Sequence, residues 1–140
     1  MATMHAKTAS LEMTLRPYRI AGEGHPTWIR TRLELRRNDG VLLSTTLSVT
    51  KEDLAELQAL VREVVTATRS EFSITTMDED LIIEVRRVES PNDVAIGFWT
   101  GEPYDLIVGY RFVVGMSDLA QFATDIRADE ESVAPPSRLP

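Results

Sequence analysis

The residues with the clearest chemical potential are three arginines at alternate positions, Arg30, Arg32 and Arg36. In a strand, residues two apart share a face at a spacing of about 6.5–7 Å, so these side chains are expected to form one row. A guanidinium group is a planar fork of donors that suits bidentate pairing at interfaces. The row therefore predicts an arginine-rich partner surface. The other interpretation is an ordinary exposed sheet face whose charges are offset by neighbouring carboxylates.

Two aromatic residues form a second candidate site. Trp99 alternates with Phe98 and precedes a loop that contains Tyr104. Aromatic side chains of this kind anchor interfaces, but they also serve as core residues that cap the end of a sheet or barrel. Both interpretations remain open. The residues predicted to bind a partner are Arg30, Arg32, Arg36, Trp99 and Tyr104.

Catalytic and cofactor motifs are missing from the sequence. There is no cysteine, which excludes disulfides, zinc–thiolate sites and iron–sulfur clusters. His5 and His25 have no second ligand or base at a useful spacing, and no nucleophile elbow, phosphate loop or dinucleotide fingerprint occurs. We therefore expect no enzyme, no cofactor and no metal site. Carboxylates are plentiful, so an activity based on a carboxylate pair stays open.

Composition and charge narrow the expected partners. The chain of 140 residues is 43% hydrophobic and 26% charged, as is typical of one globular domain. Its net charge of −7 repels nucleic acid and anionic membranes at long range. The expected partner is thus a protein, a basic toxin or a second copy of the chain, with no nucleic acid and no membrane. No apolar run resembles a signal peptide or a membrane span, so we expect a cytoplasmic location.

Alternation of apolar and polar residues predicts several strands. A strand from Leu11 is expected to end or bulge at Pro17, which lacks a backbone donor, or to lie at a sheet edge. A hairpin from Trp28 to Val49 is expected to turn at residues 38–40, an Asn-Asp-Gly sequence that tolerates positive φ. Four further strands are predicted between residues 72 and 114. The last two, 94–99 and 106–114, are apolar on both faces and are expected to lie centrally.

Two helices complete the prediction. Thr50 is expected to cap a long helix with a broad apolar stripe, and Ser117 to cap a short C-terminal one. The order βββαββββα predicts an α+β fold: a curled antiparallel sheet of about six to seven strands with the long helix packed on one face. The expected organisation is a flexible N-terminus (1–10), a single domain (11–127) and a disordered acidic and proline-rich tail (128–140).

This layout resembles that of small bacterial immunity proteins of the WapI-like and related groups. The resemblance covers residues 11–127 and includes a leucine-rich helix, here Leu54-Ala-Glu-Leu57-Gln-Ala-Leu60, and a final helix with Leu119-Ala-Gln-Phe122. It implies a non-catalytic module that binds and neutralises a toxin. Two alternatives stay open: a self-associating structural or accessory protein, and a small-molecule binder with a pocket between the sheet and the long helix.

Overall fold

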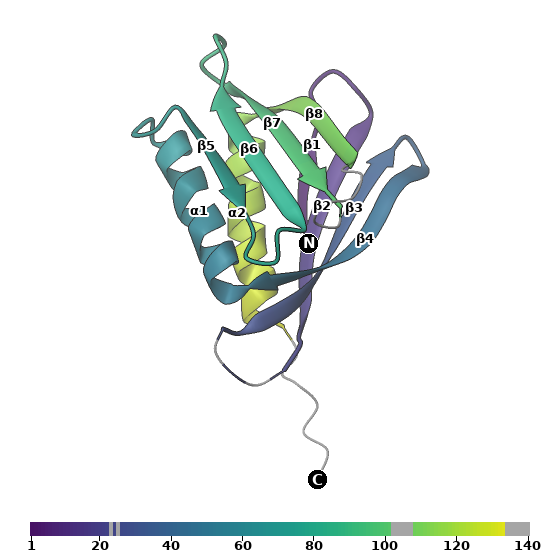
Figure 1. Ribbon diagram of the computed structural model, residues 1–140. Coiled ribbons are helices and arrows are strands. Elements are labelled where there is room, and N and C mark those ends of the chain that lie inside the picture. The colour runs from purple at the N-terminus through teal and green to yellow at the C-terminus, as the bar shows by residue number, and fades with distance from the viewer. Residues whose placement is uncertain (23, 25, 102–107, 134–140) are drawn as a thin grey trace.

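The fold consists of four strands followed by a helix, twice over (Figure 1). The computed structural model describes residues 1–22, 24, 26–101 and 108–133. The first half contains β1 (Ala2–His5), β2 (Leu11–Ile20), β3 (Trp28–Arg37), β4 (Gly40–Thr50) and α1 (Lys51–Val65). The second half contains β5 (Glu71–Thr75), β6 (Leu81–Arg87), β7 (Asp93–Thr100), β8 (Val108–Gly115) and α2 (Met116–Glu131).

Each half forms its own antiparallel sheet, in which neighbours along the chain pair with each other. Sheet A has the order β1-β2-β3-β4, and sheet B has the order β5-β6-β7-β8. The predicted turn between β3 and β4 is confirmed, and Asn38 adopts a φ of 54° there. Of the three alternatives expected for the strand at Pro17, the bulge is found, because the register of β2 against β3 shifts between Pro17 and Arg19, whereas β2 is an interior strand. The pairing of β1 with β2 reaches only to Leu15, so among the described strands Pro17 is paired with β3 alone.

Alternation decides which face of each sheet is buried. The inner faces supply apolar side chains such as Leu15, Leu33, Val85 and Phe98, all at most 2% exposed. Both helices add their apolar stripes to this core. The buried residues are Leu54, Leu57, Val61 and Val64 on α1 and Leu119, Phe122 and Ile126 on α2.

The start of α1 follows the predicted capping box. The backbone N–H of Asp53 donates to the Thr50 hydroxyl at 3.0 Å, and the Asp53 carboxylate accepts from the Thr50 N–H at 2.8 Å. The start of α2 differs from the prediction. Gly115 is its N-cap residue, with no side-chain cap bond, so Ser117 does not cap the helix. With 16 residues, α2 is also as long as α1 rather than short.

The prediction of one curled sheet of six to seven strands is wrong. No described strand of sheet A pairs with one of sheet B. The order also gains one strand, because Ala2–His5 forms β1 where a flexible segment was expected. Carboxylates of α2 hold this edge strand. The N–H of Ala2 donates to Asp129 at 3.1 Å, and the N–H of His5 donates to Asp118 at 2.7 Å.

Two further expectations change with the sheets. Strand β7 is an interior strand as expected, but β8 is the edge of sheet B, where Val108 and Val113 are exposed. Helix α2 extends to Glu131, into the segment expected to be a tail, and residues 134–140 lie outside the described residues.

Candidate functional site

Four arginines gather on the outer face of sheet A. The register places Arg16 directly opposite Arg32, and Arg19 directly opposite Arg30, on the neighbouring strands β2 and β3. All four side chains are exposed. We call these four residues the arginine cluster.

The β-bulge in β2 adds an aromatic side chain to this face. Strict alternation would bury one of two consecutive residues, but Tyr18 and Arg19 are both exposed. The extra residue at the bulge re-aims the chain, as bulges do elsewhere. Tyr18 is 37% exposed, one of the few large apolar-bodied side chains open to solvent in sheet A. Its ring therefore lies beside the arginine cluster.

The charge of the arginine cluster is not balanced locally. Among the described residues, none of the four arginines forms an ion pair, and the polar contact of Arg32 is a 3.0 Å hydrogen bond from its Nη1 to the Ser44 hydroxyl. Like charges directly opposite each other destabilise a strand pair. The adjoining positions of β4, Thr46 opposite Arg32 and Ser48 opposite Arg30, carry hydroxyl groups rather than carboxylates. The cluster is thus a positive patch open to an anion.

At the other end of the same face, carboxylates offset the arginine charge. Arg36 forms an ion pair with Glu34, and Glu12 lies directly opposite Arg36 on β2. Of the predicted arginine row, Arg30 and Arg32 therefore belong to the cluster, whereas Arg36 is ion-paired with Glu34. Sequence reasoning missed Arg16, Arg19 and Tyr18 as site residues, because only the pairing of β2 with β3 brings them there.

Trp99 lies on the outer face of the other sheet. Its indole ring lies flat across two glycines: a Cβ atom on Gly97 would lie 2.9 Å from the ring, and one on Gly109 closer still. The guanidinium carbon of Arg111 sits 5.3 Å from the ring centroid, which is the geometry of a cation–π contact. Trp99 is thus held between the backbone and Arg111 rather than packed into the core. Tyr104 lies outside the described residues.

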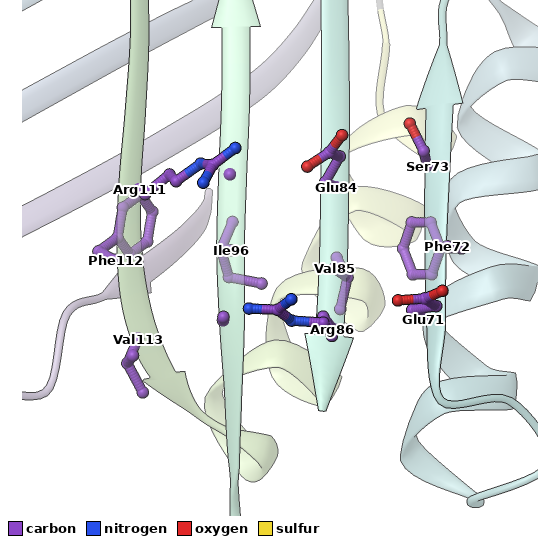
Figure 2. Close-up of a pocket in the computed structure, with 12 residues that line it drawn as sticks. Glu71, Phe72, Ser73, Glu84, Val85, Arg86, Ile96, Arg111, Phe112 and Val113 are labelled. Carbon is purple, nitrogen blue, oxygen red and sulfur yellow. The ribbon is translucent and has the colours of Figure 1, made fainter. Parts of the chain in front are cut away.

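Beside Trp99, the outer face of sheet B is hollowed. The depression measures about 610 Å³ and lies over β7, where the outward residues Ala95 and Gly97 are small (Figure 2). Its walls include Arg86 of β6 and Arg111 of β8. The hollow lies on the face of sheet B that points away from the helices. The sequence had suggested a different position, a pocket between a sheet and the long helix.

The acidic turn after β5 has a structural role. The Asp80 carboxylate accepts hydrogen bonds from the Ser48 N–H of β4 at 3.1 Å and from the Thr76 hydroxyl at 3.0 Å. Burial raises the pKa of Asp80 above its ordinary value of 3.8, more than these bonds lower it. Asp80 therefore ties the β5–β6 turn to the edge of sheet A. In the part of the chain that the structure describes, no group of three or more histidines and carboxylates is placed to hold a metal ion.

Comparison with known proteins gives matches only among solved structures. No family model matches the chain, and no curated protein matches it. A structure described as the plant transcriptional regulator PBF-2 is similar with 10% identity and a TM-score of 0.47, over 90% of this chain and 77% of the other. WHY3 from Arabidopsis thaliana is similar with 10% identity and a TM-score of 0.48, over 90% of this chain and 83% of the other.

These findings correct the functional expectation. The predicted immunity or protein-binding module, and the exclusion of nucleic acid as a partner, do not agree with these comparisons. We withdraw both expectations. The similarity transfers no residue to this chain. Neither helix among the described residues is long and apolar enough to span a membrane.

Proposed function

We propose that this chain binds single-stranded nucleic acid through the outer face of sheet A. The observation that carries the proposal is the arginine cluster, in which Arg16 faces Arg32 and Arg19 faces Arg30 with no described carboxylate paired to any of them. Guanidinium groups bind phosphates in bidentate fashion and are less strongly hydrated than ammonium groups. A row of phosphates would neutralise the repulsion that the paired arginines impose on the sheet.

The aromatic side chain favours a single strand over a duplex. Proteins that bind single strands combine a basic surface for the backbone with aromatic rings on which unpaired bases stack. Tyr18 supplies such a ring next to Arg19. In a duplex the base faces are already stacked on each other, so Tyr18 would gain no contact there.

The acidic composition of the chain does not prevent this interaction. The net charge of −7 acts at long range, but charges are screened beyond about 8 Å at an ionic strength of about 0.15 M. At contact distance a bound phosphate is governed by the arginine cluster. Of the carboxylates on this face, Glu34 is ion-paired with Arg36, and Glu12 lies directly opposite Arg36. The net charge would slow association and make binding strongly dependent on salt.

The proposal keeps two expectations from the sequence. Binding of this kind needs no catalysis, so we continue to regard the chain as a non-enzyme. A cytoplasmic location is likewise retained as part of the proposal.

The test is a fluorescence anisotropy titration with a labelled oligodeoxythymidine. We expect the triple variant Arg16→Gln, Arg30→Gln, Arg32→Gln to bind at least roughly a hundredfold more weakly, because it loses three charged contacts. The matched control changes Arg62, Arg69 and Arg127 to glutamine, which alters the net charge equally on exposed positions outside both sheets.

The outcomes separate the proposal from general electrostatic attraction. Equal weakening by the two triple variants would show that only the total charge matters. Tighter binding of a labelled duplex than of the single strand would contradict the role of Tyr18. Four phosphate contacts predict a slope of log K against log salt of about −2.8 for a single strand, and each arginine removed should reduce the slope by about 0.7.

A further inference from the structure

The hollow on sheet B is made by small residues on an interior strand. Ala95 and Gly97 occupy successive outward positions of β7, and the large Trp99 that follows lies flat across the glycines. A side chain on Gly97 would collide with the indole ring. The indole ring thus covers the floor at Gly97, whereas at Ala95 the only side chain is one methyl group. The depression of about 610 Å³ has the size of a small-molecule site.

Two arginines flank this floor, Arg86 directly opposite Ala95 and Arg111 directly opposite Gly97. Arg86 of β6 and Arg111 of β8 both extend toward β7 (Figure 2). Arg111 is held in place by its stacking on Trp99, with 5.3 Å between the guanidinium carbon and the ring centroid. Neither arginine has an ion-pair partner among the described residues. Two such forks over an open floor are suited to one shared oxyanion.

Carboxylates on the same wall restrict what can bind. Glu84 lies directly opposite Gly97, and Glu71, which also lines the hollow, lies directly opposite Arg86. A nucleic-acid strand laid across sheet B would bring its phosphates against both carboxylates. A small ligand can instead place its anionic group between the arginines and direct a hydroxyl or ammonium donor to Glu84.

We propose that the hollow of sheet B binds a small organic molecule that carries one oxyanion, a phosphate or a carboxylate, and a hydrogen-bond donor. Arg86 and Arg111 hold the oxyanion, Glu84 accepts from the donor, and the small side chain of Ala95 leaves the space. This site is separate from the arginine cluster and does not rest on nucleic-acid binding.

The experiment follows the fluorescence of Trp99 during titration. The chain has two tryptophans, so Trp28→Phe leaves Trp99 as the single reporter. Glycerol phosphate is the phosphate arm and lactate the carboxylate arm, since each also has a hydroxyl donor. We expect a saturable change with at least one of them, and the arm that responds identifies the class of oxyanion. No saturable response to either compound would overturn the proposal.

Two variants test the assigned roles in this background. Arg86→Gln removes one fork and should weaken binding by about tenfold or more. Ala95→Leu keeps both arginines but fills the floor, and it should abolish the response. Arg69→Gln, which has the same loss of charge outside the site, should leave the affinity unchanged. If the Arg86→Gln variant bound the ligand with the same affinity as its Trp28→Phe parent, the proposal would be contradicted, even if Ala95→Leu failed to fold. Oligonucleotide binding by both variants reports separately on sheet A.

Discussion

The two sheets have the same strand order, but their outer faces carry different kinds of side chain. Strand β3 is the third strand of sheet A, and it presents the long side chains of Arg30 and Arg32. Strand β7 is the third strand of sheet B, and it presents Ala95 and Gly97. One face therefore carries a patch of positive charge, and the other is a hollow with charges of both signs. The topology sets where outward positions lie, and the residue types at those positions set what the surface can bind.

The charge pairing differs as strongly as the shape. On sheet A, arginine faces arginine across β2 and β3. On sheet B, Arg86 faces Glu71 across β5 and β6. A surface that keeps like charges opposite each other gives up stability in the free protein. This difference is what leads us to assign a polyanion to sheet A and a small ligand to sheet B.

The largest effect is expected from the aromatic ring on sheet A. Tyr18→Ala should weaken binding of the oligodeoxythymidine by about 1–3 kcal/mol, the usual contribution of one stacked base. Tyr18→Phe keeps the ring and should bind as the parent does. Anisotropy titrations of both variants measure this. Similar weakening by the two changes would assign the role to the hydroxyl rather than to stacking.

A smaller effect is expected from the glycines beneath Trp99 on sheet B. Gly109→Ala should lower the free energy of unfolding by about 1–2 kcal/mol, because the new Cβ displaces the indole ring and its contact with Arg111. Gly22→Ala is the control, since nothing lies within 4 Å of a Cβ there. Urea denaturation monitored by circular dichroism compares the two. Equal stabilities would mean that the ring is not fixed on the sheet.

Reversing one charge on sheet A should separate stability from binding. Arg16→Glu places a carboxylate opposite Arg32 and should raise the free energy of unfolding by about 0.2–1 kcal/mol while weakening oligonucleotide binding. Glu71→Arg on sheet B places an arginine opposite Arg86 and should lower stability by a similar amount. Denaturation curves at low salt test both changes. A loss of stability in Arg16→Glu would contradict the repulsion inferred for the cluster.

The smallest effect concerns Asp80, which joins the two halves. Its pKa is raised in the folded state, so the folded protein binds the proton more tightly than the unfolded chain does. The stabilising contribution is therefore present below pH 3.8 and is lost as the pH rises through the raised pKa. Asp80→Asn should remove this part of the pH dependence. The measurement is the difference between the two proteins' unfolding free energies across the weakly acidic range, and a constant difference would contradict the assignment.

Local features were predictable from the sequence for local reasons. The alternation in β3 identified its buried and exposed faces, since successive residues of a strand point to opposite sides. The turn at Asn38 and the cap at Thr50 depend on side chains within three residues of the feature itself. The exposure of Arg30, Arg32 and Arg36, and the orientation of Trp99 away from Phe98, followed from the same alternation.

Tertiary structure alone decided the arrangement of these elements and of the sites. Alternation does not state which strands pair, so it left one sheet and two sheets equally compatible with the pattern, and it gave no sign that α2 carboxylates would hold β1. The arginine cluster depends on the register of β2 against β3 and on the bulge at Tyr18. The hollow depends on strands that bring Gly97 and Gly109 under one indole ring. Pairing and register are set by the burial of a common core, which is a property of the whole chain rather than of any segment.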